Sequence, residues 1–184
     1  MARLPYLEPS DLTQENRDLL ARNVNIYREL VHSPEGTRSF LHLAKFIRFH
    51  SRLDPRLREM AILQVGYVAR SPYEYSHHIK IGREFGVSDE DIRAIAEETN
   101  GRPTSLAALP KAVLRAAREM TIQATVSDET FAALKPGLDN EQLVDLMITI
   151  SFYTGVVRLL AALQIDVEGD YLQYLQEFPL PKDG

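Results

Sequence analysis

The chain of 184 residues contains no cysteine. This absence excludes disulfide frameworks, zinc fingers, iron–sulfur clusters, thiol peroxidases and cysteine nucleophiles, because each of them needs a thiol. It also leaves the redox compartment open, since a chain without thiols has no residue that reports on it. A chain of this length buries a hydrophobic core without disulfides or a metal, and it predicts one domain.

Other signals are missing as well. The sequence has no Gly-x-Ser-x-Gly elbow and no glycine-rich phosphate loop, which disfavours nucleophilic hydrolase chemistry. It has no run of Lys or Arg, and its formal net charge is −5, so neither nucleic acid nor an anionic membrane is an expected partner. The longest uncharged run, from Leu146 to Val157, is shorter than the roughly 20 residues of a membrane-spanning helix. The N-terminus lacks the apolar segment of a signal peptide, so we expect a soluble cytoplasmic protein.

Apolar residues recur at helical spacing along nearly the whole chain. Residues 55–69 are apolar almost all the way round the predicted helix, which indicates a central, buried helix. No paired alternating runs are joined by a tight Asn-Gly or Asp-Gly turn, so hairpins are not expected. We therefore predict an all-α fold with one domain over residues 1–184, of which 178–184 form a loose C-terminal tail. The predicted helices are 11–31, 37–50, 55–69, 73–85, 88–100, 111–124, 127–134 and 140–163.

One segment combines residues suited to acid–base chemistry. Glu74 and His78 are four residues apart, so they share one face of a helix. Such a carboxylate and imidazole can transfer a proton or polarise a small oxygen-rich ligand. Ser71 stands at the predicted start of the same helix, and Glu59 lies on the preceding helix, where burial would raise its pKa.

Each of these residues also has a purely structural interpretation. Ser71 and Glu74 have the spacing of a capping box, in which both side chains bond backbone amides. Glu59 lies early in its helix, where a carboxylate favours the helix dipole, and His78 would suit a core position bonded to a carbonyl. Metal binding through Glu74, His78 and the adjacent His77 is not predicted, because neighbouring residues diverge by about 100° on a helix.

The run from Leu53 to Ile95 resembles the core of the carboxymuconolactone decarboxylase family, which is related to the alkylhydroperoxidase D-type proteins. The segments NIYREL (25–30), ATVSDETFAAL (124–134) and ISFYTGVVRLLAAL (150–163) add to the resemblance, which extends from about residue 4 to residue 166. The resemblance implies an all-α, alkylhydroperoxidase-like helical domain. It also implies a homo-oligomer, a trimer or hexamer, assembled through these helices.

The thiol branch of that family has a glutamate, a Cys-x-x-Cys pair and then a histidine. Compared position by position, the glutamate corresponds to Glu59 and the histidine to His78. The two cysteine positions hold Ser71 and Glu74. The resemblance therefore implies that the glutamate and the histidine of the proton relay are present, whereas both thiols are absent. Such a protein cannot perform the disulfide-based peroxidase reaction.

The decarboxylase branch has a Tyr-Glu-Trp-x-x-His-type pattern, and residues 73–78 read YEYSHH. By this resemblance, the carbon left after decarboxylation would be protonated by the Glu–His pair, while a buried arginine would hold a carboxylate. Arg158, inside an otherwise apolar helix, is the candidate for that arginine; the alternative is a structural ion pair with Asp145. Relatives often have asparagine where Thr154 and Ala161 stand, so the best-known substrate of the family is not implied.

The predicted function is a cofactor-independent decarboxylase, or a related lyase or isomerase, acting on a small lactone or carboxylic acid. Its predicted catalytic residues are Glu59, Glu74 and His78, and its predicted substrate-binding residues are Ser71 and Arg158; no metal is expected. The alternative is a non-catalytic helical oligomer or small-ligand-binding protein that has kept the fold. A Glu74 that only caps backbone amides, with His78 facing a filled core, would favour this alternative.

Overall fold

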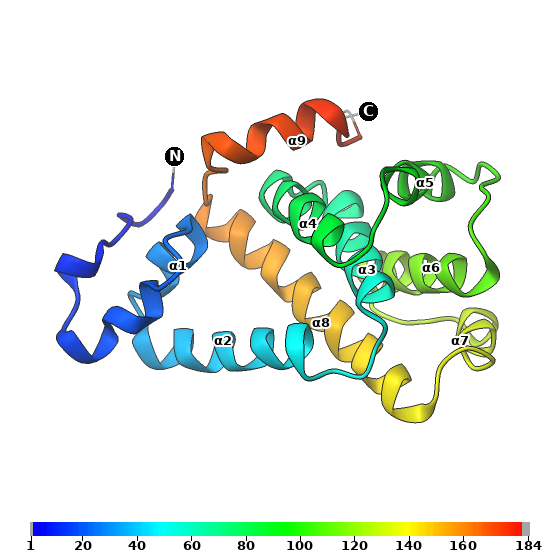
Figure 1. The fold of residues 1–184 in the computed structure, drawn as a ribbon, viewed down its shortest axis with the longest axis horizontal. Helices are drawn as coiled ribbons and strands as arrows, with labels where there is room; N and C mark the ends of the chain where they lie inside the picture. Colours follow the sequence, from blue (N-terminus) through cyan, green and yellow to red (C-terminus); the bar gives the residue numbers. More distant parts are fainter. Residues whose placement is uncertain (1, 182–184) are drawn as a thin grey trace.

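The computed structural model describes residues 2–181, and these contain helices and no strand, so the predicted all-α class is confirmed. Figure 1 shows the helices grouped around a central pair, α3 and α8. The α-helices are α1 (Asn25–Leu30), α2 (Pro34–Phe49), α3 (Pro55–Val68), α4 (Pro72–Glu84), α5 (Asp89–Thr99), α6 (Ala108–Gln123), α7 (Asp128–Leu134), α8 (Asn140–Leu163) and α9 (Leu172–Glu177). Three 3-10 segments are η1 (Pro9–Asp11), η2 (Gln14–Leu20) and η3 (Gly169–Tyr171).

The helix α3 lies at the centre and contacts α4, α5, α6 and α8. Its start is well defined, because an Asp54 carboxylate oxygen accepts a hydrogen bond from the Leu57 amide at 3.0 Å and Pro55 occupies the first turn. Every residue from Leu57 to Tyr67 is buried. The sequence pattern, apolar on most sides, therefore identifies the central helix correctly, and the few polar residues buried with it include Glu59.

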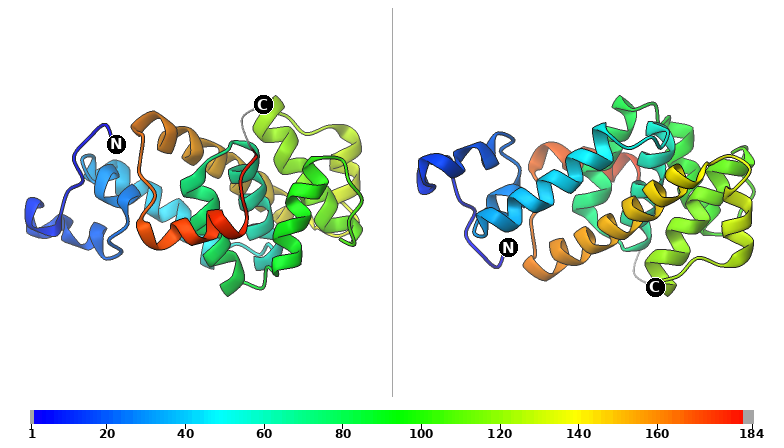
Figure 2. Two further views of the ribbon diagram at one scale, coloured as in Figure 1. Left: turned by 90° about the horizontal axis from the view of Figure 1, so that it is seen from above. Right: turned by 90° about the horizontal axis from the view of Figure 1, so that it is seen from below.

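The helix α8 crosses the molecule beside α3, as both views of Figure 2 also show. Of the helices in residues 2–181, α8 alone is long and apolar enough to span a membrane by length and composition. Its inner face is buried in the protein core, including Leu146, Ile150 and Val157. Because a core helix passes the same test of length and composition, this feature is weak evidence for a membrane span.

The predicted helix over residues 11–31 is wrong: the stretch is divided into η2 and the short α1. Val24 between them has extended backbone angles, φ −110° and ψ 148°. No neighbouring side chain caps α1; instead, the Asn25 amide donates a hydrogen bond to Glu168, 143 residues away, at 2.7 Å. The start of α1 is thus stabilised by a contact that local periodicity cannot reveal.

The chain after α8 folds back over α4. Gln164 adopts the left-handed conformation at φ 55° and ends α8, and α9 then packs along α4 at the top of Figure 1. The sequence did not predict this short helix. Phe178, the first residue of the predicted tail, is buried in a core cluster with Met60 and Tyr75, so the chain stays packed to that point. Residues 182–184 of the predicted tail lie outside the described residues.

Candidate active site

The site depends on a close approach of α3 and α4. A methyl group on Gly66 would stand 3.1 Å from the Tyr75 amide nitrogen, so only glycine fits this approach without a shift. The start of α4 is stabilised by Ser71, whose hydroxyl accepts a hydrogen bond from the Glu74 amide at 3.4 Å. This arrangement brings Glu59 of α3 next to His78 of α4.

Buried charged groups form a continuous chain across the two helices. The Arg58 guanidinium donates from Nε to Oε1 of Glu59 at 3.0 Å, and Nδ1 of His78 lies 2.7 Å from Oε2 of Glu59. On the other side of the ring, Nε2 of His78 lies 3.0 Å from Oε1 of Glu74. None of these four side chains is more than 6% exposed. Because both ring nitrogens face carboxylates, the geometry favours a His78 that has a proton on each nitrogen.

The pKa shifts agree with this geometry. Burial alone lowers the pKa of His78, but the charges of Glu74 and Glu59 outweigh it and raise that pKa to about 9. For Glu59, burial raises the pKa, but the positive charges of His78 and Arg58 outweigh it and leave the pKa below its ordinary value. At neutral pH the relay therefore contains an imidazolium paired with a carboxylate.

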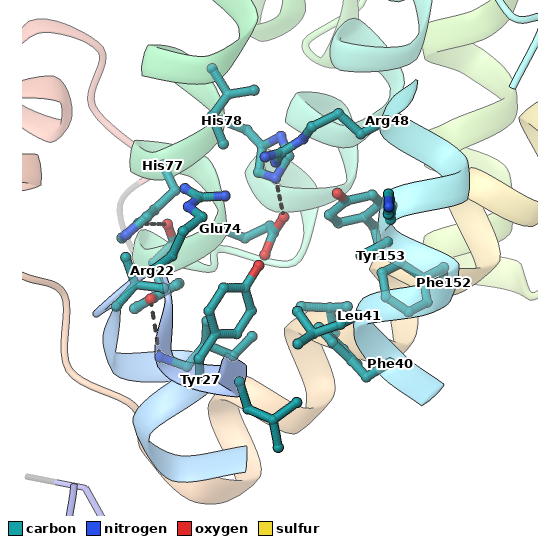
Figure 3. Close-up of a pocket in the computed structure, with 18 of the residues that line it drawn as sticks. Arg22, Tyr27, Phe40, Leu41, Arg48, Glu74, His77, His78, Phe152 and Tyr153 are labelled. Carbon is teal, nitrogen blue, oxygen red and sulfur yellow. Dashed lines mark hydrogen bonds and ion pairs between the residues drawn. The ribbon is translucent and has the colours of Figure 1, made fainter. Parts of the chain in front are cut away.

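The series of buried charged groups ends at a cavity of about 310 Å³ between α1, α2, α4 and α8. Glu74 and His78 line this cavity, whereas Glu59 lies behind them. Figure 3 shows His78 and Glu74 joined at the cavity, with the Tyr27 hydroxyl pointing toward the Glu74 carboxylate. The remaining wall is mainly apolar and aromatic; it includes Phe40, Leu41, Phe152 and Tyr153.

Three cationic side chains also line the cavity: Arg22, Lys45 and Arg48. None of the three forms an ion pair with another of the residues 2–181. The other acidic residue of the lining besides Glu74, Asp18, is paired with Arg38 at 3.1 Å. The cavity can therefore accept an anionic group next to its acid–base pair. Sequence reasoning missed these cations, because charged residues on the polar side of an amphipathic helix have the pattern of a solvated face.

Tyr153 is a further residue that the sequence did not single out. Its ring meets the His78 ring edge-on, with centroids 4.9 Å apart. Burial, followed by the nearby charges of Glu74 and Glu59, raises the pKa of its phenol well above 10. Tyr153 is thus a neutral hydroxyl that lines the cavity beside the relay.

The structure separates the two interpretations of Ser71 and Glu74. Ser71 caps α4 and does not line the cavity. Its own amide bonds the Gly66 carbonyl, and the Glu74 carboxylate contacts His78 instead of completing a capping box. Ser71 therefore positions the helix that presents Glu74.

Arg158 is not where the sequence placed it. The expectation of a buried arginine is wrong: Arg158 is exposed on the outer side of α8, donates to the Thr154 carbonyl at 3.0 Å, and does not line the cavity. The alternative pair with Asp145 is absent too, because Asp145 accepts hydrogen bonds from the Ser51 hydroxyl and the Arg52 amide. On a helix whose sequence is apolar on most sides, periodicity could not tell the outer side from the inner.

His77 points away from the relay and has its own partners. Its ring stacks between Tyr73 and Tyr171, with centroids 4.0 and 3.6 Å away. Its Nδ1 lies 2.9 Å from the Tyr73 carbonyl, and its Nε2 lies 3.1 Å from Glu168. Across residues 2–181, no group of three or more His, Asp or Glu side chains is arranged to hold a metal ion.

The fold is that of the alkylhydroperoxidase-like helical proteins. An uncharacterized peroxidase-related protein from Ralstonia eutropha JMP134, described as an alkylhydroperoxidase AhpD core, shares 19% identity over 98% of both chains, with a TM-score of 0.77. A Cys-to-Ala variant of the debrominase Bmp8, in complex with 2,3,4-tribromopyrrole, shares 18% identity over 97% of this chain and 100% of that one, with a TM-score of 0.81. At these identities the likeness concerns the fold alone.

The sequence profile of the carboxymuconolactone decarboxylase family matches residues 34–119, from α2 through most of α6. This match covers 86 of the 184 residues, and the chain contains no cysteine. The resemblance inferred from the sequence is thereby confirmed. A comparison with curated protein sequences gives no significant match.

Proposed function

We propose that the protein is a decarboxylase, or a related lyase or isomerase, that acts on a small lactone or carboxylic acid. The observation that supports this proposal is the buried Glu59–His78–Glu74 chain, which ends at a cavity lined by unpaired cations. A non-catalytic protein that merely kept the fold would have no need to bury these charges, which are costly to desolvate. Without thiols, peroxidase chemistry through a disulfide is not part of the proposal.

The two ends of the relay have different roles in this proposal. Both nitrogens of His78 face carboxylates, so neither N–H is directed at a ligand in the cavity. We therefore propose that Glu74 exchanges a proton with the substrate and that His78 supplies this proton to Glu74. Glu59 acts through His78: it holds the proton on Nδ1 and so leaves Nε2 to exchange with Glu74. Both His78 and Glu59 are positioning residues in this sense.

For a decarboxylation the proton balance is simple. The proton on Nε2 of His78 moves to Glu74, and the bond between the substrate carbon and its carboxylate breaks. CO₂ leaves, the electron pair stays on the carbon, and protonated Glu74 delivers its proton there. Glu74 ends as a carboxylate and His78 as a neutral ring, which regains one proton from water. The net reaction consumes one proton for each CO₂ released.

In this proposal the cations of the cavity, and not Arg158, bind the carboxylate of the substrate. Arg48 and Lys45 come from α2 and Arg22 from the segment before α1, so none of the three belongs to α4, the helix of Glu74 and His78. A substrate carboxylate held there would leave the rest of a small ring against Phe40 and Phe152, whose centroids are 4.9 Å apart. We further propose that the protein works in the cytoplasm as a homo-oligomer, without a cofactor or metal.

The test uses a panel of γ-lactones, unsaturated acids and β-keto acids in heavy water. Release of CO₂ and deuterium incorporation at carbon, followed by NMR, both detect acid–base chemistry. We expect Glu74→Gln to reduce either rate by about 100-fold or more, the usual contribution of a general acid or base. Glu141→Gln, an exposed glutamate paired with Arg52, makes the same chemical change outside the site and should leave the rate unchanged.

The same panel tests the alternative function. If the wild-type protein binds these acids but promotes neither CO₂ release nor deuterium exchange, it is a small-ligand-binding protein. If Glu74→Gln keeps the full rate of the wild-type protein, the assignment of Glu74 is wrong.

A further inference from the structure

A second cleft lies between the end of α5 and α6, away from the first cavity. It measures about 440 Å³, and none of its lining residues lines the cavity of the candidate active site. The helices α5 and α6, which contribute lining residues to it, are at the right of Figure 1, whereas α1 and the first half of α2 are at the left. Its charged lining residues are Glu98, Arg102, Lys111, Arg115 and Arg118.

Three of these cations form one row on α6. Lys111, Arg115 and Arg118 are separated by four and then three residues, a spacing that places them on the same face of the helix. Like charges at these spacings repel each other and destabilise a helix. Arg102, from the loop after α5, adds a fourth positive charge to the cleft.

Two of these cations, Arg115 and Arg102, have partners that are easily exchanged. Arg115 pairs with Glu129 at 2.7 Å, and Arg102 pairs with Glu97 at 3.2 Å. The side chains of Glu129 and Arg102 are 80% and 65% exposed. Exposed ion pairs contribute little to stability, so a ligand with several negative oxygens can take their place.

Arg118 differs from the others because it forms no ion pair with any of residues 2–181. Its guanidinium donates one hydrogen bond, from Nη1 to Oε1 of Gln64 at 3.0 Å. Gln64 is fully buried, and its amide nitrogen donates to the Thr99 hydroxyl at 3.0 Å. A buried amide thus orients a half-buried guanidinium whose other donors remain available.

The pKa of Arg118 is lowered, as expected for a half-buried cation without an ion pair among residues 2–181. Burial lowers the pKa of Arg118, the nearby charge of Glu98 raises it, and the like charge of Arg115 lowers it further. Glu98, the one acidic residue of the lining, lies 3.5 Å from Lys111 and also accepts a hydrogen bond from Thr104. It therefore pairs with Lys111, while Arg115 pairs with the exposed Glu129, and Arg118 is the cation of the lining that has no ion pair within residues 2–181.

We propose that this cleft binds a phosphate-type oxyanion, either inorganic phosphate or the phosphate group of a small molecule. A tetrahedral dianion accepts hydrogen bonds from several directions, so it can bridge Arg118, Arg115 and a third cation at once. A planar carboxylate carries a single negative charge and two acceptor oxygens, so it balances fewer of these cations than a phosphate dianion does. The proposed phosphate site is independent of the proposed decarboxylase reaction. A negative result for phosphate binding would therefore leave the proposed reaction unaffected.

The experiment is a calorimetric titration of the full-length protein with inorganic phosphate at low ionic strength. We expect saturable binding of one phosphate per chain, weakened about tenfold in Arg118→Gln by loss of a charge-assisted contact. Arg115→Gln should weaken binding in the same direction. Arg17→Gln, which removes one exposed positive charge elsewhere, is the matched control and should bind as the wild type does.

Two further arms locate the anion and define its chemistry. Arg48→Gln removes a cation of the first cavity, and phosphate binding should survive it. Acetate should bind more weakly than phosphate, whereas a simple phosphomonoester should compete with it if the cleft takes a phosphorylated molecule; without competition, the ligand is free phosphate.

Three outcomes would overturn the proposal. These are non-saturable binding, equal affinity in Arg118→Gln and Arg17→Gln, or loss of phosphate binding in Arg48→Gln alone. Should Arg118→Gln fail to fold by circular dichroism, Arg115→Gln replaces it in the same comparison, because Arg115 is partly exposed and its loss should leave the fold intact.

Discussion

At the scale of single residues, Glu59 connects the two halves of the buried charge network. Its two oxygens accept from different cations, Arg58 on one side and His78 on the other. Arg58 in turn donates to the Arg48 carbonyl near the end of α2 at 3.0 Å. Glu59 therefore couples the proton relay to the helix that supplies two of the cavity cations.

Replacing Glu59 by Gln should destabilise the protein strongly. The change removes one charge of a buried pair and leaves Arg58 and His78 facing a neutral amide, which typically costs about 3 kcal/mol or more. Equilibrium denaturation measures this loss. Glu141→Gln removes an exposed partner of Arg52 and should cost less than about 1 kcal/mol; equal losses in the two variants would contradict the buried network.

The raised pKa of His78 predicts a stability that depends on pH. The pKa is about 9 in the folded protein against 6.5 for an ordinary histidine. The contribution is therefore complete below about pH 6.5 and disappears as the pH rises through about 9. We expect a loss on the order of 2 kcal/mol over this range, measured by denaturation at several pH values.

The effect of His78 on the pH profile can be separated from that of Glu59. The variant His78→Gln should show a flatter profile between pH 6.5 and 9. Glu59 affects stability in the acidic range instead. Its pKa is lowered in the folded protein, so its contribution to stability disappears as the pH falls through that lowered value. A wild-type profile that is level across the alkaline range would contradict the charged His78.

At the scale of elements, the register of α3 against α4 decides whether the relay forms. Gly66 allows the close approach, with the Tyr75 backbone as the obstacle to any side chain. Glu59 and Gly66 are two turns apart on α3, so a shift at Gly66 is transmitted to the contact with His78.

Gly66→Ala should therefore reduce both stability and activity, the former by about 1–3 kcal/mol because the added methyl overpacks the crossing. Gly155→Ala is the matched control: this glycine lies in α8 with no atom within 4 Å of an added methyl. There, alanine should leave activity unchanged and stabilise the helix by up to about 1 kcal/mol. Thermal unfolding of both variants measures the difference, and a Gly66→Ala protein as stable as Gly155→Ala would refute the close crossing.

Some secondary-structure elements can be predicted from the sequence and others cannot. The helix α3 is predictable because its proline start and apolar run are local signals. The division between η2 and α1 is not, because its stabilising contact, Glu168 with the Asn25 amide, joins residues far apart in the chain. The same reason applies to α9, a helix of six residues that is held by packing on α4.

At the scale of the whole molecule, Glu168 joins three distant parts of the chain. Its carboxylate accepts from the Asn25 amide at 2.7 Å and from the Tyr73 hydroxyl at 3.1 Å, and it lies 3.1 Å from His77. It thus ties the C-terminal segment to α1 and α4, both of which line the cavity.

Glu168→Gln should loosen this connection and destabilise the protein by about 2 kcal/mol, because charge-assisted hydrogen bonds are lost in a half-buried place. Hydrogen exchange should rise in α9 and α1 together. Glu177→Gln, which removes a surface partner of Arg83, should change neither by a comparable amount. If exchange rose in α9 alone, Glu168 would not couple the two helices.

The assembly state is a separate prediction at this scale. The family resemblance implies a trimer or hexamer, and light scattering at micromolar concentration measures it directly. We expect a mass that is a multiple of 20.9 kDa. A monomer under these conditions would contradict the expected homo-oligomer and any site that a second copy completes.

The sequence by itself determined the helical class, the central helix, the family resemblance and the spacing that puts Glu74 and His78 on one face. These are properties of neighbouring residues, and helical periodicity records them. The tertiary structure decided the rest: Glu59 meets His78 through a packing register, Arg48 and Lys45 of α2 line the cavity, and Arg158 faces outward. Which side of an apolar helix is buried, and which charges meet across a core, follows from the packing of distant segments. Local periodicity contains no record of that packing.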